Sequence, residues 1–380
     1  MQAYSYGTLR HLGLLRFVLK SLIKREQKNP QVNALLLVAL YQLEYGKAPH
    51  YAVVDHAVKS VTAIAGKGLK PFANAVLRQY LRKRDELLQA ARQDEVATWS
   101  YPRWWIDKLR SQVGAQAEAV LTAGNQHPPM ALRVNRRRLE ATQYLASLEQ
   151  LGIEASVVGE AGVVLDQPMP VEQLPGFRDG SVSVQDIAAQ RSAPLLDLQP
   201  GQLVVDACAA PGGKAGHILE CADVHLIALD NDADRLAKVG ENLQRLRLRA
   251  DLCCADAARL EAWWDGKPVD RVLLDAPCSA SGVVRRHPDV KWLRREEDLA
   301  GFSRQQKRLL DALWQVVAGG GKLLYVTCSV FREENQEQVE WFLSGHKDAR
   351  LAARHADTGG ELLLPCAQHD GFFHALFEKA

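Results

Sequence analysis

The sequence predicts an α/β chain in three parts: an all-helical region over residues 1–95, a small mixed α/β unit over 96–185 and a doubly wound α/β region over 186–380. Apolar residues recur at helical spacing in the first part, and apolar strand-like runs alternate with helical stretches in the last. The 380 residues suffice for two to three domains of about 150 residues each. A hydrophobic content of 47% supports packed cores and excludes a disordered chain.

The first region is predicted to be a set of amphipathic helices. Apolar residues recur at spacings of three and four from residue 9 to residue 88. Turn and helix-stop residues interrupt this pattern at 29–30, at 46–49 and at 66–71. Each interruption is expected to separate one helix from the next.

The charge of the chain is unevenly distributed. Residues 1–84 contain 14 Lys and Arg residues but three Asp and Glu residues, whereas the whole chain has a net charge of +2. A basic helical region of this kind is typical of proteins that bind polyanions such as RNA. Solvated basic helices without a partner explain the charge alone almost as well.

The middle region changes character after residue 127. A helical pattern and three short strand-like runs predict a small mixed α/β unit. The expected helix spans residues 139–151, and the expected strands span 131–135, 153–158 and 163–165. Arg136, Arg137 and Arg138 lie between the first strand and the helix. A phosphate contact and a solvated turn explain these arginines equally well.

A parallel sheet is predicted from residue 202 onward. Apolar runs rich in β-forming residues are separated by helical stretches and cover residues 203–206, 225–230, 251–254, 270–275 and 322–327. Carboxylates end or closely follow four of these runs: Asp206, Asp230, Asp256 and Asp275. Because ligands of such sheets bind outside the carboxyl ends of the strands, these acids are expected to line one edge of the sheet, where a ligand would bind.

The segment DACAAPGGK, residues 206–214, follows the first strand and opens a helix. Its glycines allow a ligand to approach the backbone, and it is neither a Walker A loop nor a GxGxxG motif. Asp230 lies where a carboxylate usually accepts hydrogen bonds from ribose hydroxyls, and Asp256 is placed to receive an adenine amino group. Helix N-capping explains Asp206 or Asp230 singly, but three acids in register favour a nucleotide-like ligand.

The seven cysteines indicate free thiols rather than a disulfide framework or a zinc site, because no CxxC pair occurs and the number is odd. Cys278 and Cys328 each lie just past a predicted strand, so both are expected to face one cleft. Cys253 or Cys254 is instead expected to be buried within its strand as a small hydrophobic residue.

No membrane span and no signal peptide are expected. The longest apolar run, residues 34–41, is far shorter than the roughly 20 residues that cross a bilayer. Arg16 and Lys20 interrupt the apolar segment 12–23, which excludes a signal-peptide core. The chain is therefore expected in the cytoplasm, and a monomer is expected because nothing in the sequence demands an oligomer.

Together these motifs resemble those of the RNA cytosine-5 methyltransferases, and the resemblance covers nearly the whole chain. The matching segments are SVQDIAAQ (183–190), DACAAPGGK (206–214), LDND (229–232), CADA (254–257), DAPCSASG (275–282), RRHPDVKW (285–292), TCS (327–329) and DGFF (370–373). Residues 39–82 resemble a NusB-like RNA-binding domain that is fused to such an enzyme. The chain begins where that domain has further helices in the family, so the resemblance also implies an N-terminally incomplete domain.

The resemblance implies both a fold and an activity. The fold would combine a NusB-like all-α domain (1–95), a linker with a small α/β subdomain (96–185) and a class I Rossmann-like methyltransferase domain (186–380). The activity would be methylation of carbon 5 of a cytosine in small-subunit (16S) ribosomal RNA. S-Adenosyl-L-methionine would be the cofactor, no metal would be needed, and a cysteine would form a covalent adduct at carbon 6.

The resemblance also implies roles for individual residues. Cys328 would be the nucleophile, Cys278 would assist its release, and Asp275 would contact the cytosine ring. Lys214 would hold the base or balance the carboxylates of the site, although an ordinary lysine at a helix N-terminus explains it equally well. The cofactor would be bound by Cys208, Ala209, Ala210, Pro211, Gly212, Gly213, Lys214, Asp230, Asp256 and Asp275.

Two other functions compete with this interpretation. A nicotinamide-linked dehydrogenase would share the sheet and the ribose carboxylate, but the chain lacks GxGxxG and such an enzyme gives no reason for two cysteines at strand ends. A non-enzymatic RNA-binding regulator is disfavoured because every catalytic position expected from the resemblance is filled. Arg285, Arg286 and His287, with Trp292 nearby, fit an RNA backbone and stacking surface.

Overall fold

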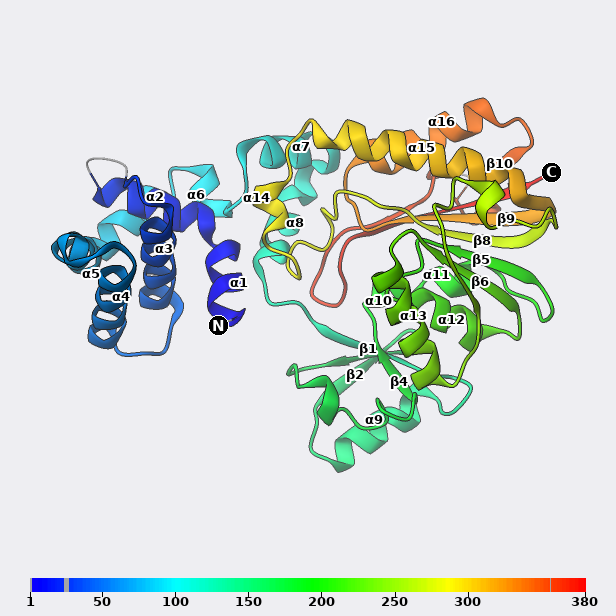
Figure 1. Cartoon of the computed structure of the whole chain (residues 1–380), viewed down its shortest axis with the longest axis horizontal. Helices are drawn as coiled ribbons and strands as arrows, with labels where there is room; N and C mark the ends of the chain where they lie inside the picture. Colours follow the sequence, from blue (N-terminus) through cyan, green and yellow to red (C-terminus); the bar gives the residue numbers. More distant parts are fainter. Residues whose placement is uncertain (1, 24–26, 356) are drawn as a thin grey trace. The chain divides into compact units, whose positions relative to one another are not determined.

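The computed structural model describes residues 2–23, 27–355 and 357–380. It divides into two compact units, residues 1–127 with 284–296 and residues 128–283 with 297–380 (Figure 1). Lys24, Arg25 and Glu26, which belong to the predicted basic region, lie outside the described residues. The domain ranges expected from the sequence stay a prediction; the structure adds that residues 284–296 pack with the N-terminal helices.

The described residues of the first unit form helices and no strands, which agrees with the helices predicted over residues 1–95 and extends beyond that range. Its α-helices are α1 (Gln2–Arg10), α2 (Leu12–Leu22), α3 (Pro30–Tyr45), α4 (His50–Ala65), α5 (Lys70–Ala91), α6 (Glu95–Trp99), α7 (Arg103–Val113), α8 (Ala117–Asn125) and α14 (Val290–Leu293). The predicted interruptions coincide with the helix ends. At the first of them, the Asn29 side chain accepts the backbone N–H groups of Gln31 and Val32 and so caps α3, with Pro30 as its first residue.

The segment 284–296 is held in this unit by buried polar contacts. The Lys291 ammonium group donates to the carbonyl of Arg10 at 2.9 Å and to the side-chain oxygen of Asn125 at 2.6 Å. The Trp292 indole donates to the carbonyl of Leu9 at 2.8 Å. Lys291 has no exposed surface, so these acceptors compensate the cost of burying its polar head.

The second unit begins with a small antiparallel sheet in the order β2-β3-β1-β4. Its strands are β1 (Met130–Val134), β2 (Ala155–Val158), β3 (Gly162–Leu165) and β4 (Val182–Val184), and α9 (Ala141–Gln150) packs against them. The first three strands and the helix were predicted within two residues at each end. The strand β4 was not predicted, because a strand of three residues has too little alternation to be recognised.

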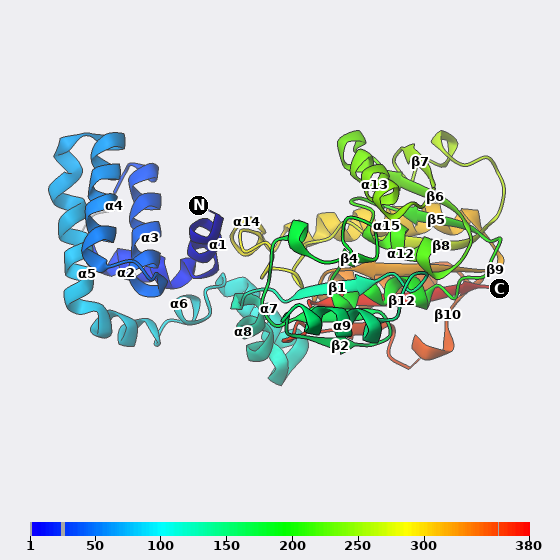
Figure 2. The same cartoon turned by 90° about the horizontal axis from the view of Figure 1, so that it is seen from below.

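The large sheet of the second unit has the order β10-β12-β9-β8-β5-β6-β7, with β11 paired to β12 (Figure 2). Its strands are β5 (Leu203–Ala207), β6 (His225–Asp230), β7 (Asp251–Cys254), β8 (Val269–Asp275), β9 (Val317–Thr327), β10 (Ala349–Leu351), β11 (Glu361–Leu363) and β12 (Phe372–Lys379). The five predicted strands, β5 to β9, are parallel as expected. The antiparallel strand β12 was not predicted.

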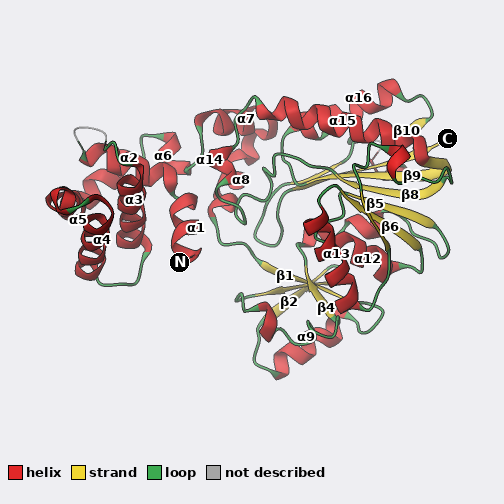
Figure 3. Cartoon of the chain, in the orientation of Figure 1, coloured by secondary structure: helices red, strands yellow, loops and turns green. Residues whose placement is uncertain are grey.

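Helices cover both faces of the large sheet, which is the doubly wound arrangement (Figure 3). On one face, Val204, Leu273 and Leu324 pack with α12 (Gly213–Cys221) and α13 (Ala233–Leu246). On the other, Val205, Val272 and neighbouring residues pack with α15 (Asp298–Val316) and α16 (Gln336–Gly345). This alternation of buried residues leaves the carboxyl ends of the strands free to carry polar side chains.

Candidate active site

A pocket of about 380 Å³ lies at the carboxyl ends of the parallel strands β5 to β9. Seven of the residues singled out from the sequence line it: Cys208, Ala210, Asp230, Asp256, Asp275, Cys278 and Cys328. They come from segments up to 120 residues apart, and the parallel sheet brings them together because its strand ends share one edge. Ala209, Pro211, Gly212, Gly213 and Lys214 belong to the loop beside the pocket and the start of α12.

The loop between β5 and α12 depends on glycine for its shape. Gly212 adopts φ +94°, in the left-handed region, and a Cβ atom there would lie 3.0 Å from the Cα atom of Val239. The loop passes close to Asp230, whose carboxylate accepts the backbone N–H groups of Ala210 at 3.2 Å and Asp232 at 3.1 Å. The side chain of Asp230 is thereby oriented at the mouth of the pocket.

Asp206 is a fully buried acid near the end of β5. It has no exposed surface, and neither of its carboxylate oxygens has a hydrogen-bond partner among the described residues. Burial, with a smaller contribution from nearby Asp275, raises the pKa of Asp206 to about 8. A buried carboxyl with two unused oxygens indicates a site for a donor that the protein itself does not supply. The sequence marked this residue as a strand-end acid but did not include it in the cofactor site.

Lys214 and Asp275 form an ion pair, with 2.6 Å between the Lys214 Nζ and Asp275 Oδ2 atoms. Burial alone would lower the pKa of Lys214, but Asp275 outweighs it and the net shift is upward. The lysine is thus held as a cation next to the pocket, with its Nζ atom also 5.4 Å from the centre of the Phe372 ring. Phe372 belongs to the DGFF segment at the start of β12.

The two strand-end cysteines are adjacent. The Sγ atoms of Cys278 and Cys328 are 3.4 Å apart, and both residues are partly exposed where they line the pocket. The hydrogen bond with Cys328, then burial, then the nearby Glu334 raise the pKa of Cys278 well above its usual value. The protonated form of Cys278 is therefore favoured in this arrangement.

Asp256 lines the pocket, but its carboxylate accepts hydrogen bonds from a residue that the sequence did not single out. Arg308, on α15, binds both carboxylate oxygens of Asp256, at 2.9 Å and 3.1 Å. The pair stands in the pocket lining together with Gln305. No spacing in the sequence links residue 308 to residue 256, because their contact arises from the packing of α15 beside the sheet.

Two expectations about individual residues are wrong. Arg285 was expected on an RNA-facing surface but is 1% exposed, because its segment is packed among the helices of the first unit. Neither Cys253 nor Cys254 is buried, since β7 is the last strand of the sheet and its residues have no strand on their outer side. Whether a cysteine in a strand is buried depends on whether that strand lies inside the sheet or at its edge. A single strand-like run in the sequence does not reveal this.

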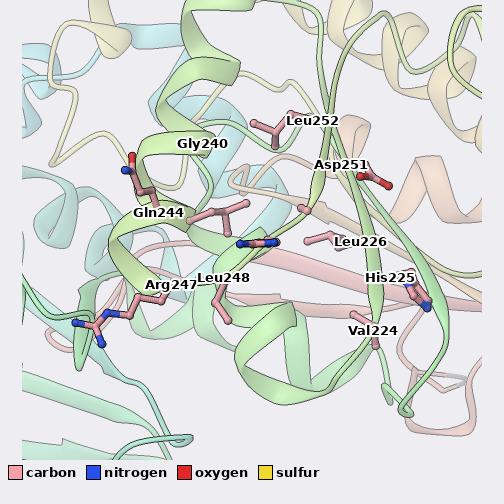
Figure 4. Close-up of a pocket in the computed structure, with 12 residues that line it drawn as sticks. Val224, His225, Leu226, Gly240, Gln244, Arg247, Leu248, Asp251 and Leu252 are labelled. Atoms are coloured by element: carbon pink, nitrogen blue, oxygen red, sulfur yellow. The ribbon is translucent and has the colours of Figure 1, made fainter.

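A larger cavity of about 710 Å³ lies at the opposite ends of two strands (Figure 4). Gln244 and Arg247, at the C-terminal end of α13, line it together with His225 and Asp251, the first residues of β6 and β7. None of the residues predicted for catalysis or cofactor binding lines this cavity. The size of a cavity is therefore not what identifies the site; the grouping of reactive side chains does.

Within residues 2–23, 27–355 and 357–380, no helix has the length and apolarity needed to cross a membrane. In the same ranges, no group of three or more His, Cys, Asp or Glu side chains is arranged to hold a metal ion.

Three regions of the chain each match a known protein family or domain. Residues 193–378 match the family model of 16S rRNA methyltransferase RsmB/F, residues 101–172 match the ferredoxin-like domain of RsmF/B-like methyltransferases, and residues 1–82 match the NusB family. The fold class expected from the sequence, a NusB-like helical domain with a Rossmann-like methyltransferase fold, is confirmed.

Relatives match over the full length. Ribosomal RNA small subunit methyltransferase B of Vibrio cholerae is 42% identical, over 100% of this chain and 89% of the relative. A crystal structure of the protein PH0851 is 25% identical with a TM-score of 0.85, over 100% of this chain and 89% of the other. A methyltransferase homologue from Pyrococcus horikoshii is 26% identical with a TM-score of 0.66, over 76% and 98%. The chain belongs to the 16S rRNA methyltransferase RsmB/F family.

Proposed function

We propose that this protein methylates carbon 5 of a cytosine in small-subunit ribosomal RNA, using S-adenosylmethionine and a covalent cysteine adduct. The observation that carries the proposal is the pair of thiols 3.4 Å apart in a pocket that also contains Asp275 and Asp230. The name of the Vibrio cholerae relative supports ribosomal RNA of the small subunit as the substrate. The basic helices of the first unit supply charge suited to RNA phosphates.

The residues of the site fit the cofactor. S-Adenosylmethionine supplies a methyl group that is activated for transfer to a nucleophilic carbon. Asp230, oriented by two backbone N–H groups at the end of β6, would accept hydrogen bonds from the ribose hydroxyls. Asp206, whose buried oxygens have no partner among the described residues, would take the ammonium group of the methionine part. Gly212 would let that part approach the backbone.

Cys328 would carry out the first covalent step. Its thiolate, formed by loss of the thiol proton to water, adds to carbon 6 of the cytosine, and the displaced electron pair makes carbon 5 nucleophilic. Carbon 5 would then bond to the methyl group as the bond between that methyl group and the sulfonium sulfur breaks, leaving S-adenosylhomocysteine. The family resemblance assigns this role to Cys328, and the Lys214 ammonium group lies close enough to interact with it electrostatically. Asp275 would hold the cytosine ring while charge moves through it.

Cys278 would act in the release of the methylated product. The hydrogen bond with Cys328 is the largest cause of the raised pKa of Cys278, and it is lost once the Cys328 sulfur is bonded to carbon 6. Cys278 can then give its proton to water and, as a thiolate, take the proton from carbon 5. The electron pair of the broken carbon–hydrogen bond restores the double bond and expels Cys328 as a thiolate. The Cys328 thiolate then takes a proton from water, which returns the enzyme to its starting state with a net release of one proton.

Transfer of a tritiated methyl group from S-adenosylmethionine to 16S ribosomal RNA tests the function. The proposal expects incorporation into small-subunit RNA and no incorporation into an RNA of the same length that lacks cytosine. Incorporation that does not depend on cytosine would contradict the proposed target.

Asp206→Asn is expected to weaken cofactor binding and to stabilise the free protein. The loss of one charge-assisted hydrogen bond, about 1.5–3 kcal/mol, corresponds to a Kd raised about 10- to 150-fold. The raised pKa of Asp206 costs the folded state stability as the pH rises from about 4 to about 8, because the unfolded carboxyl ionises first. The free energy of unfolding of the variant is therefore expected to exceed that of the wild type by about 0.5–2 kcal/mol at pH 8 and to differ little from it at pH 4.

Calorimetry with S-adenosylmethionine and thermal unfolding at the two pH values measure these effects. The matched control is Asp251→Asn, which replaces an exposed acid at the start of β7. It is expected to change neither cofactor binding nor stability. A variant of Asp206 that binds the cofactor as tightly as the wild type would show that this carboxyl is not a cofactor ligand.

A further inference from the structure

A single buried carboxylate joins the two cysteine loops. Glu334, the last residue of the short 3-10 helix Arg332–Glu334, has no exposed surface. Its Oε1 atom accepts the backbone N–H of Ser279 at 2.8 Å and the amide N–H of Gln306 at 3.2 Å. Its Oε2 atom accepts the hydroxyls of Ser279 and Ser329, each at 2.5 Å. Ser279 directly follows Cys278 and Ser329 directly follows Cys328, so Glu334 binds the residue next to each thiol.

The backbone around Glu334 is anchored as well. The Tyr325 hydroxyl donates to the carbonyl of Glu334 at 2.7 Å. The next residue, Asn335, accepts the hydroxyl of Thr327 at 2.6 Å and donates to the carbonyl of Ser329 at 2.9 Å. All of these residues are buried. Such a network fixes the positions of its members, because a buried donor that loses its acceptor is costly.

Glu334 also acts on one thiol through its charge. It contributes to the upward shift in the pKa of Cys278, after the hydrogen bond with Cys328 and burial. Tyr325 is a further titratable group beside Glu334 and Cys278, and Lys214 interacts electrostatically with Cys328. Burial raises the pKa of Glu334 itself, and the hydrogen bonds that it accepts oppose that shift. The two thiols thus stand in unequal electrostatic environments.

We propose that Glu334 is a positioning residue: its buried carboxylate, bonded to the residue next to each thiol, holds Cys278 and Cys328 at their separation and makes their surroundings unequal, so that they act in successive steps. The inference rests on the function proposed above, because it assigns the two thiols to successive steps. Glu334 is not among the residues that line the pocket, so it acts through the two loops rather than on the substrate.

Glu334→Gln tests the positioning role. The substitution keeps the size of the side chain but removes its charge and one acceptor oxygen. The kcat of methyl transfer is expected to fall about 10- to 100-fold, since small misplacements of reacting groups cost this much, with the KM for RNA unchanged. Glu337→Gln, an exposed glutamate on α16, is the matched control and is expected to retain the wild-type kcat.

A second readout needs neither RNA nor cofactor. The rate at which iodoacetamide alkylates Cys278 is measured against pH, by mass spectrometry of the peptide that contains it. Because a nearby anion raises the pKa of a thiol, Glu334→Gln is expected to shift the midpoint of alkylation to lower pH. This readout separates the two proposals: a wild-type protein that does not methylate cytosine contradicts the function, whereas an unchanged midpoint overturns the role of Glu334.

Ser329→Ala decides the question if Glu334→Gln does not fold. It removes one donor to Glu334 and leaves the carboxylate in place, so a milder loss of kcat, about three- to tenfold, is expected. A wild-type kcat in Glu334→Gln, or in Ser329→Ala when the first variant is unfolded, overturns the proposal. A lowered kcat with an unshifted alkylation midpoint also overturns it, because that result reports a structural defect alone.

Discussion

Cys328→Ala is expected to abolish methyl transfer, lowering kcat by about 10⁴-fold or more, because carbon 5 of cytosine is not nucleophilic until a thiolate has added to carbon 6. The pocket walls that would hold the cofactor include other residues, among them Ala210, Asp230 and Asp256, which this substitution leaves in place. Binding of S-adenosylmethionine, followed by calorimetry, is therefore expected to be unchanged. Tritiated methyl transfer to ribosomal RNA measures the loss.

Cys254→Ala is the matched control for this variant. Cys254 is an exposed cysteine at the end of the edge strand β7, so its replacement is expected to leave the rate at the wild-type value. Full activity in Cys328→Ala would show that this thiol is not the nucleophile. Loss of activity in both variants would point to a general sensitivity to cysteine replacement instead.

Cys278→Ala is expected to trap the enzyme on its RNA. Cys328 still adds to carbon 6, but the thiol that lies 3.4 Å from its sulfur is no longer there to take the proton from carbon 5. The covalent complex should accumulate as a band of lowered mobility on a denaturing gel, with turnover reduced to about a hundredth or less of the wild-type value.

The double variant Cys278→Ala with Cys328→Ala provides the control for trapping. It is expected to give no shifted band, because the sulfur that would form the adduct is missing. A shifted band in the double variant would place the covalent bond at another residue. Normal turnover without a band in Cys278→Ala would remove this thiol from the release step.

The sequence predicted those features that are encoded locally. Helix-stop residues such as Asn29 and Pro30 mark the ends of helices wherever the helices pack, and the five parallel strands were recognised from short apolar runs bounded by turn residues. The grouping of Asp230, Asp275 and Cys328 followed from one rule, that parallel strands present their carboxyl ends at the same edge. The family resemblance added the roles of the thiols, which residue chemistry alone does not order.

The features that were missed depend on contacts between distant segments. The strand β12 pairs antiparallel with β9, and nothing near residue 372 indicates that partner. Arg285 is buried because its segment packs with α1 and α8, which lie more than 150 residues earlier in the chain. Glu334 was overlooked for the same reason, since its partners Ser279 and Gln306 become its neighbours only when β8, β9 and α15 assemble.

The central claim is that this chain forms 5-methylcytosine in small-subunit ribosomal RNA. Bisulfite sequencing of 16S ribosomal RNA tests it most directly, in cells that contain this protein, in cells that lack it, and in cells that carry the Cys328→Ala variant. The account predicts one cytosine that resists conversion when the active protein is present and is converted in the other two cases. A pattern of resistant cytosines that is the same in all three would contradict it.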